Sequence, residues 1–144
     1  MPNIRCFRAT RLGRSERGAA AVEFAIILPI LVMFVFGIVQ FSIAYNHQQG
    51  LHAAAREGAR IAALPQTDQA TITSRVHSAL QGVLSSTDIQ KASITVSPAA
   101  NQPCDGVAPG THVVVTVSAP DQIAIPLVVD KSVTLTGRGE FLCE

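Results

Sequence analysis

The chain has 144 residues, of which 48% are hydrophobic and only 15% are charged, and its formal net charge is +1. An average soluble domain carries about 25% charged residues, so the composition favours a membrane-associated protein. A nucleic-acid-binding protein spreads basic residues over a folded surface. Here five of the eleven basic residues gather instead at the start of the chain, as Arg5, Arg8, Arg11, Arg14 and Arg17. We therefore expect no nucleic-acid partner.

An uncharged run, residues 24–45, follows these arginines. As a helix, a run of this length spans about 33 Å, close to the ~30 Å hydrocarbon core of a bilayer. Because arginines stay on the cytoplasmic side, the C-terminal part is expected outside. We predict a basic leader at 1–18, a single-pass transmembrane helix at 19–45 and an extracytoplasmic α+β domain at 46–144. A secretory signal cut after residues 42–44, Ser-Ile-Ala, is an alternative, although its apolar core is usually shorter.

Glu23 is the acidic residue at the start of this run. A carboxylate at the edge of a membrane is stabilised by pairing with a cation. If the chain is cut after Gly18, the new amine on Ala19 lies one helical turn from Glu23, or the carboxylate reaches the amine of a neighbouring subunit. The alternative is an interfacial acid with no partner.

Two sequence motifs in this region are specific when they occur together. Residues 17–29 read Arg-Gly-Ala-Ala-Ala-Val-Glu-Phe-Ala-Ile-Ile-Leu-Pro, and residues 53–60 read Ala-Ala-Ala-Arg-Glu-Gly-Ala-Arg. Together they resemble the TadE-like family of tight-adherence (Flp-type) pseudopilins, over roughly residues 16–63. The residues that resemble a prepilin processing site are Gly18, Ala19, Glu23 and Phe24, and the other motif positions are Pro29, Arg56, Glu57, Gly58 and Arg60.

The resemblance implies cleavage after Gly18 by a prepilin peptidase, and a role as a pseudopilin or minor pilin-like subunit in biogenesis of a bacterial Flp-type pilus. It implies a place in the inner membrane, with the N-terminus cytoplasmic, and possible export to the surface pilus. The implied partners are the peptidase, other pseudopilins, the major pilin and an inner-membrane assembly platform. Residues 40–42, Gln-Phe-Ser, depart from the family where many relatives carry a glutamate. The alternative function is an uncleaved membrane-anchored envelope protein whose outer domain binds a partner or ligand.

Pro29 and Gly37 both weaken a helix, although membrane helices tolerate them. They predict either a modest kink or a segment that unwinds when the subunit leaves the bilayer.

Residues 46–64 are expected to continue the helix into water. Small residues recur there at every fourth position and form a ridge that comprises Gly50, Ala54, Gly58 and Ala62. This small-residue ridge is expected to pack either on the protein's own sheet or against a partner helix. Arg56, Glu57 and Arg60 are expected on a solvated face.

The C-terminal half of the chain predicts a helix followed by strands. Thr67 is the expected N-cap of a helix that stops near Ser85-Ser86, with one apolar stripe: Ile72, Val76, Ala79, Leu80, Val83 and Leu84. Alternating segments at 93–97, 112–118 and 132–136 predict three strands, the second ending at Pro120 and the third with an optional extension toward Phe141. Pro126 argues against a central strand at 123–129. The predicted fold is α+β: a long N-terminal transmembrane helix that extends into a small outer domain, in which the second helix packs on a three-stranded antiparallel sheet.

Three cysteines are present, and Cys6 lies in the arginine-rich leader. Cys104 and Cys143 are left as a pair outside the cytoplasm, where disulfides persist. We predict that they form a bridge, with two free thiols or an intermolecular bridge as alternatives.

The sequence offers little catalytic chemistry. His47 and His52 lie on different faces of the predicted helix, and no metal-binding or phosphate-binding motif is present. Three aspartates are expected in turns: Asp105, Asp121 and Asp130. We therefore expect no enzyme, no cofactor and no metal site; the chain is expected to be a substrate of the peptidase.

Overall fold

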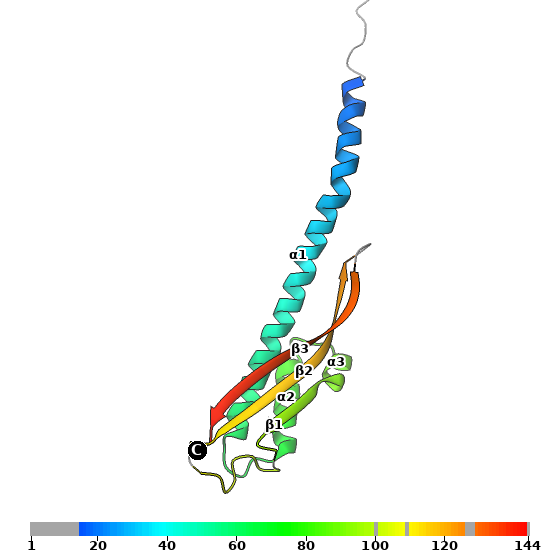
Figure 1. The fold of residues 1–144 in the computed structure, drawn as a ribbon. Coiled ribbons are helices and arrows are strands. Elements are labelled where there is room, and N and C mark those ends of the chain that lie inside the picture. The colour runs from blue at the N-terminus through cyan, green and yellow to red at the C-terminus, as the bar shows by residue number, and fades with distance from the viewer. Residues whose placement is uncertain (1–14, 100, 109, 126–128, 144) are drawn as a thin grey trace, which may run out of the picture.

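The computed structural model describes residues 15–99, 101–108, 110–125 and 129–143. A helix of 48 residues leads into a small domain of two short helices and a three-stranded antiparallel sheet in the order β1-β2-β3 (Figure 1). The elements are α1 (Ser15–Ala62), α2 (Gln69–Leu80), α3 (Ser86–Lys91), β1 (Ser93–Ser97), β2 (His112–Ile125) and β3 (Val129–Leu142). The predicted α+β fold is confirmed. The predicted leader, with Cys6, lies largely outside the described residues.

The core lies between the C-terminal part of α1, the helix α2 and one face of the sheet. Apolar residues at helical spacing on α1 and α2 meet alternate residues of β2, which is the pattern that two such elements bury. Fully buried side chains include Leu51 on α1, Ile72, Val76 and Leu80 on α2, and Val113, Val115 and Val117 on β2. The predicted apolar face of β2 is therefore confirmed.

The small-residue ridge of α1 packs on the protein's own domain. A β-carbon built on Gly58 would lie 2.6 Å from Val76 Cγ2 and 3.3 Å from Val115 Cγ1, so α2 and β2 occupy the space above this glycine. Gly50 meets Val83 in the same way. Of the two alternatives for the ridge, the intramolecular one is confirmed.

The second predicted helix is wrong in its bounds. The N-cap is Asp68 rather than Thr67, because the Asp68 carboxylate accepts a hydrogen bond of 3.1 Å from the Thr71 backbone N–H. The helix α2 ends at Leu80, not near Ser85-Ser86, and Ala79 of the predicted stripe is exposed. Ser85 instead caps α3, a helix that was not predicted: its hydroxyl accepts from the Asp88 backbone N–H at 3.3 Å.

The strands β2 and β3 are longer than predicted. The strand β1 matches its predicted bounds, but β2 continues past Pro120 to Ile125, and β3 begins at Val129. Proline is tolerated here because β1 pairs with β2 only as far as Ser118, so the rest of β2 has a neighbour on one side only. Asp121 and Asp130 consequently lie in strands rather than in the predicted turns, and Pro126 lies outside the described residues.

Candidate functional site: the exposed part of α1

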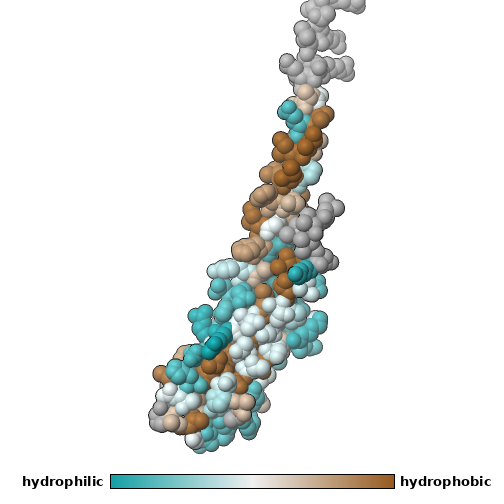
Figure 2. Space-filling view, viewed as in Figure 1, coloured by the Kyte–Doolittle hydropathy of each residue, from teal (hydrophilic) through white to brown (hydrophobic). Residues whose placement is uncertain are grey.

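The N-terminal part of α1 stands clear of the domain. All residues from Gly18 to Phe36 are exposed, and large apolar side chains dominate this surface. Figure 2 shows the apolar surface gathered on this part of α1, whereas the visible face of the domain mixes hydrophilic and intermediate surface with smaller apolar patches. An apolar surface of this size is not stable in water, so it indicates contact with a membrane or with other chains.

Among the residues that the structure describes, α1 is the helix that is long and apolar enough to cross a membrane. A buried core helix of a soluble protein would pass the same test of length and composition. That interpretation fails here because none of the most apolar window of α1, with mean hydropathy 2.7, is buried. The finding supports anchoring in a membrane.

The predicted processing-site residues lie on this exposed part. Gly18 and Ala19 are in the first turns of α1, and Glu23 and Phe24 follow one turn later, with Phe24 60% exposed. Glu23 forms no ion pair with any described side chain. A β-carbon on Gly18 would meet nothing within 4 Å, so packing within the described chain does not require a glycine there.

Pro29 also lies inside α1, and the helix continues through both Pro29 and Gly37 without a break. Gly37, like Gly18, has open space around its Cα. These two glycines thus differ from Gly50 and Gly58, whose space is filled by neighbouring side chains.

The motif residues Arg56, Glu57 and Arg60 lie on the outer face of α1. Arg60 donates two hydrogen bonds to the Glu57 carboxylate, at 2.9 and 2.8 Å, and these bonds hold the pKa of Glu57 below its usual value. Arg56 donates to the His52 carbonyl at 3.3 Å. Both arginines are exposed, so the predicted solvated face is confirmed, and Gly58 faces the opposite way, into the domain.

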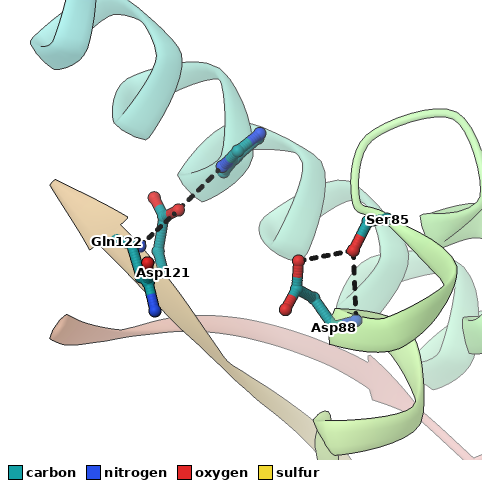
Figure 3. A network of polar contacts seen from close by, with 5 residues as sticks. Ser85, Asp88, Asp121 and Gln122 are labelled. Atoms are coloured by element: carbon teal, nitrogen blue, oxygen red, sulfur yellow. Dashed lines mark hydrogen bonds and ion pairs between the residues drawn. The ribbon is translucent and has the colours of Figure 1, made fainter. Parts of the chain in front are cut away.

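Polar contacts that were not predicted join α1 to the sheet near the end of the apolar run. His47 Nδ1 lies 3.2 Å from Asp121 Oδ1 on β2, and Gln48 Nε2 donates to the Thr136 carbonyl on β3 at 2.7 Å. The signal for these contacts was weak, because Asp121 follows Pro120 and is typical of a turn. Figure 3 shows Asp121 with Gln122 on β2, close to Ser85 and Asp88 at the start of α3.

The predicted disulfide is present. Cys104 and Cys143 are bonded across 39 residues, and the Cys143 backbone N–H donates to the Thr111 carbonyl at 2.8 Å. The bond thus fixes the end of the chain after β3 to the loop between β1 and β2.

An open depression of about 400 Å³ lies between α3 and the far parts of β2 and β3, and Asp88, Lys91 and Asp121 are among its lining residues. Some of its polar groups pair with one another: the Ser85 hydroxyl donates to the Asp88 carboxylate at 2.6 Å, and the Gln122 backbone N–H donates to the Asp121 carboxylate at 2.9 Å. No group of three or more metal-binding side chains occurs within the described part of the chain. This arrangement suits a solvated surface and assigns no catalytic role.

The fold and the exposed helix together define a class: a membrane-anchored α+β protein whose anchoring helix is also the main helix of its folded domain. Residues 18–60 match the model of a protein family described as TadE-like protein, in agreement with the resemblance noted in the sequence. The match covers 43 of the 144 residues, all of them on α1. A search of curated proteins and a search of solved structures found no match.

Proposed function

We propose that this protein is a pseudopilin or minor pilin-like subunit that acts in biogenesis of a Flp-type pilus and is matured by prepilin peptidase cleavage after Gly18. The proposal places the protein in the inner membrane with its arginine-rich start in the cytoplasm. Its partners would be the peptidase, other pseudopilins, the major pilin and the assembly platform. The chain acts as a substrate of the peptidase and has no catalytic role of its own.

The exposed processing segment is the observation that carries this proposal. Gly18 to Phe24 protrude from the domain on a continuous helix, so a membrane peptidase reaches the bond after Gly18 without unfolding the domain. Because no described residue packs around Gly18, recognition by an enzyme accounts for a glycine there better than the fold does. After cleavage, the same exposed helix is free to pack against the helices of other subunits.

A secretory signal cut after Ala44 fits the structure less well. Ala44 lies inside α1, and the following residues continue as the helix that forms the core of the domain. An uncleaved anchored protein remains the alternative function, and the depression beside α3 is where such a protein would offer polar groups to a ligand.

Paired glycine substitutions on α1 test the proposal. Gly18→Val and Gly37→Val change two residues of the same helix that both have open space around them, so neither change disturbs the fold. Coexpression with a prepilin peptidase is expected to remove the segment 1–18 from the wild type and from Gly37→Val, as seen by intact mass, and to leave Gly18→Val at full length. If coexpression of the peptidase changed the mass of none of the three proteins, the proposal would be contradicted.

A further inference from the structure

The outer edge of β3 is covered by side chains of α1. The strand β3 is an edge strand, because the sheet has the order β1-β2-β3, and it lies along the C-terminal part of α1 (Figure 1). Gln48 Nε2 donates a hydrogen bond of 2.7 Å to the Thr136 carbonyl, and the Arg138 backbone N–H donates one of 3.3 Å to His52 Nδ1. These four residues form an edge joint, in which two side chains of α1 take the place of a fourth strand.

Both ring nitrogens of His52 face hydrogen-bond donors. The Arg138 backbone N–H points at Nδ1, and the amide nitrogen of Gln48 lies 3.1 Å from Nε2. The Thr136 carbonyl sets the orientation of the Gln48 amide, because a carbonyl can only accept. A neutral imidazole has one acceptor nitrogen and an imidazolium has none, so a protonated ring accepts neither hydrogen bond. The edge joint therefore requires a neutral His52.

The charges nearest to His52 disfavour a proton on its ring. Arg56, one turn later on α1, donates to the His52 carbonyl at 3.3 Å, and Arg138 on β3 is itself a cation. The helix α2 adds a further cation, Arg75, whose charge reaches Glu57. Among the described side chains, no carboxylate forms an ion pair with His52.

The carboxylates of α1 and β3 in this region are paired elsewhere. Glu57 on α1 is held by Arg60 at 2.8 Å. Glu140 on β3 lies 2.8 Å from His112 Nδ1 and 3.4 Å from the Arg138 guanidinium. The strand β2 contributes buried apolar side chains to the core that it shares with α1: Val113, Val115 and Val117. A positive charge on His52 would thus have no compensating partner.

Two other histidines have the opposite environment. His47 Nδ1 lies 3.2 Å from a carboxylate oxygen of Asp121, and His112 Nδ1 lies 2.8 Å from one of Glu140. Protonation strengthens each of these pairs, because a hydrogen bond between two charged groups is stronger than one between neutral groups. Acid therefore favours these two contacts and disfavours the edge joint. Since His47 precedes His52 on the same helix, it is a matched control.

We propose that His52 makes the edge joint sensitive to acid: the joint is closed while the ring is neutral and opens when the ring gains a proton. Histidine side chains change charge near pH 6.5, so the joint is present above this range and is lost below it. Opening frees the Arg138 backbone N–H and weakens the hold of α1 on the edge of β3. The inference rests on contacts within the domain and holds whether or not the chain is cut after Gly18.

Amide hydrogen exchange at Arg138 tests the proposal. The isotope-labelled full chain in detergent micelles is compared by NMR at about pH 7.5 and about pH 5, on either side of the histidine range, and each exchange rate is divided by the intrinsic rate at that pH. We expect protection of the Arg138 amide to fall roughly fivefold or more at the lower pH, as for the loss of one or two hydrogen bonds. The Ala63 amide, which donates to the Ala59 carbonyl at 3.0 Å, should keep its protection. Unchanged protection at Arg138, or an equal loss at Ala63, would overturn the proposal.

Two substitutions separate His52 from the other histidines. His52→Asn should keep Arg138 protected at both pH values, because the asparagine oxygen can take the place of Nδ1 as acceptor and does not titrate. His47→Asn, the control, should lose protection at Arg138 on acidification as the wild type does. A parallel loss in His52→Asn and the wild type would contradict the proposal.

A direct titration of the wild type decides the outcome if His52→Asn fails to fold or leaves Arg138 unprotected at the higher pH. The NMR signals of the His52 ring and of the Arg138 amide are followed over the same pH range. The proposal predicts one common midpoint for both signals. An Arg138 amide signal that does not change as the His52 ring gains its proton would show that the two are not joined.

Discussion

Gly137 on β3 lies directly against the backbone of Leu51 on α1, so closely that a β-carbon there would overlap the Leu51 carbonyl. The anchoring helix and the edge of the sheet are thus joined through their backbones. Gly139 repeats the contact at Ala55. The orientation of the domain on its anchor depends on these two glycines.

Gly137→Val is therefore expected to destabilise the domain. The added side chain has no space, and overpacking of this kind costs about 1–3 kcal/mol or more when a backbone must move. Denaturant unfolding of the detergent-solubilised protein, followed by circular dichroism, measures the loss. Gly82→Val is the control, because Gly82 is exposed with nothing within 4 Å of its added β-carbon. A Gly137→Val protein as stable as the control would show that the backbone contact is absent.

Loss of the disulfide is expected to lower stability by about 2–4 kcal/mol, because the bond closes a loop of 39 residues in the unfolded chain. The double variant Cys104→Ser and Cys143→Ser should match the reduced wild type in a denaturant titration. Cys6→Ser, which leaves the bond intact, is the control. Equal stability of the oxidised and reduced wild type would contradict this expectation.

Asp68 is expected to make the stability of α2 depend on pH. Hydrogen bonding from Thr71, through its side chain and its backbone N–H, holds the pKa of Asp68 below its usual value. A lowered pKa in the folded state means that the stabilisation is present above about pH 4 and is lost as the pH falls through the folded-state pKa.

Two substitutions separate the capping effect from the charge. Asp68→Asn keeps an N-cap acceptor and should retain α2 while removing this part of the pH dependence, whereas Asp68→Ala should lose the cap at every pH. Thermal unfolding scans between pH 3 and 7 compare them with Asp105→Asn, which removes an exposed turn aspartate. If Asp68→Asn and wild type lost stability in parallel on acidification, the assignment to Asp68 would be wrong.

Pro29→Ala is expected to leave membrane insertion and recovery in sheared pilus fractions unchanged. The helix α1 continues through Pro29, so the proline alters the helix locally and does not interrupt it. Immunoblots of membrane and pilus fractions make the comparison. A selective loss from the pilus fraction would instead support unwinding at Pro29 on leaving the bilayer.

The membrane segment, the strand β1 and the apolar face of β2 could be predicted because each rests on a local pattern. An uncharged run of bilayer length, or valine at every second position as in Val113, Val115 and Val117, has few alternative explanations. The disulfide could be predicted because only one pairing was left outside the leader.

The extension of β2 and β3 beyond β1, and the helix α3, could not be predicted in the same way. Pro120 normally argues against a strand, and only the end of β1 at Ser118 makes it acceptable. The contacts of His47 with Asp121 and of Gly137 with Leu51 join residues that are far apart in the sequence, which no local pattern reveals. The sequence does contain a signal for α3, because Ser85 followed three positions later by Asp88 is similar to a capping box. Ser85 and Ser86 are equally compatible with the end of the preceding helix, which is how the sequence analysis interprets them.

The identity of the first residue in the mature protein tests the central claim most directly. Protein purified from membranes of the native bacterium is sequenced from its N-terminus, with intact mass as a second readout. Ala19 is expected as the first residue, with Glu23 in the fifth position of the mature chain. Met1 or Pro2 as the first residue would contradict it and would favour an uncleaved membrane-anchored protein.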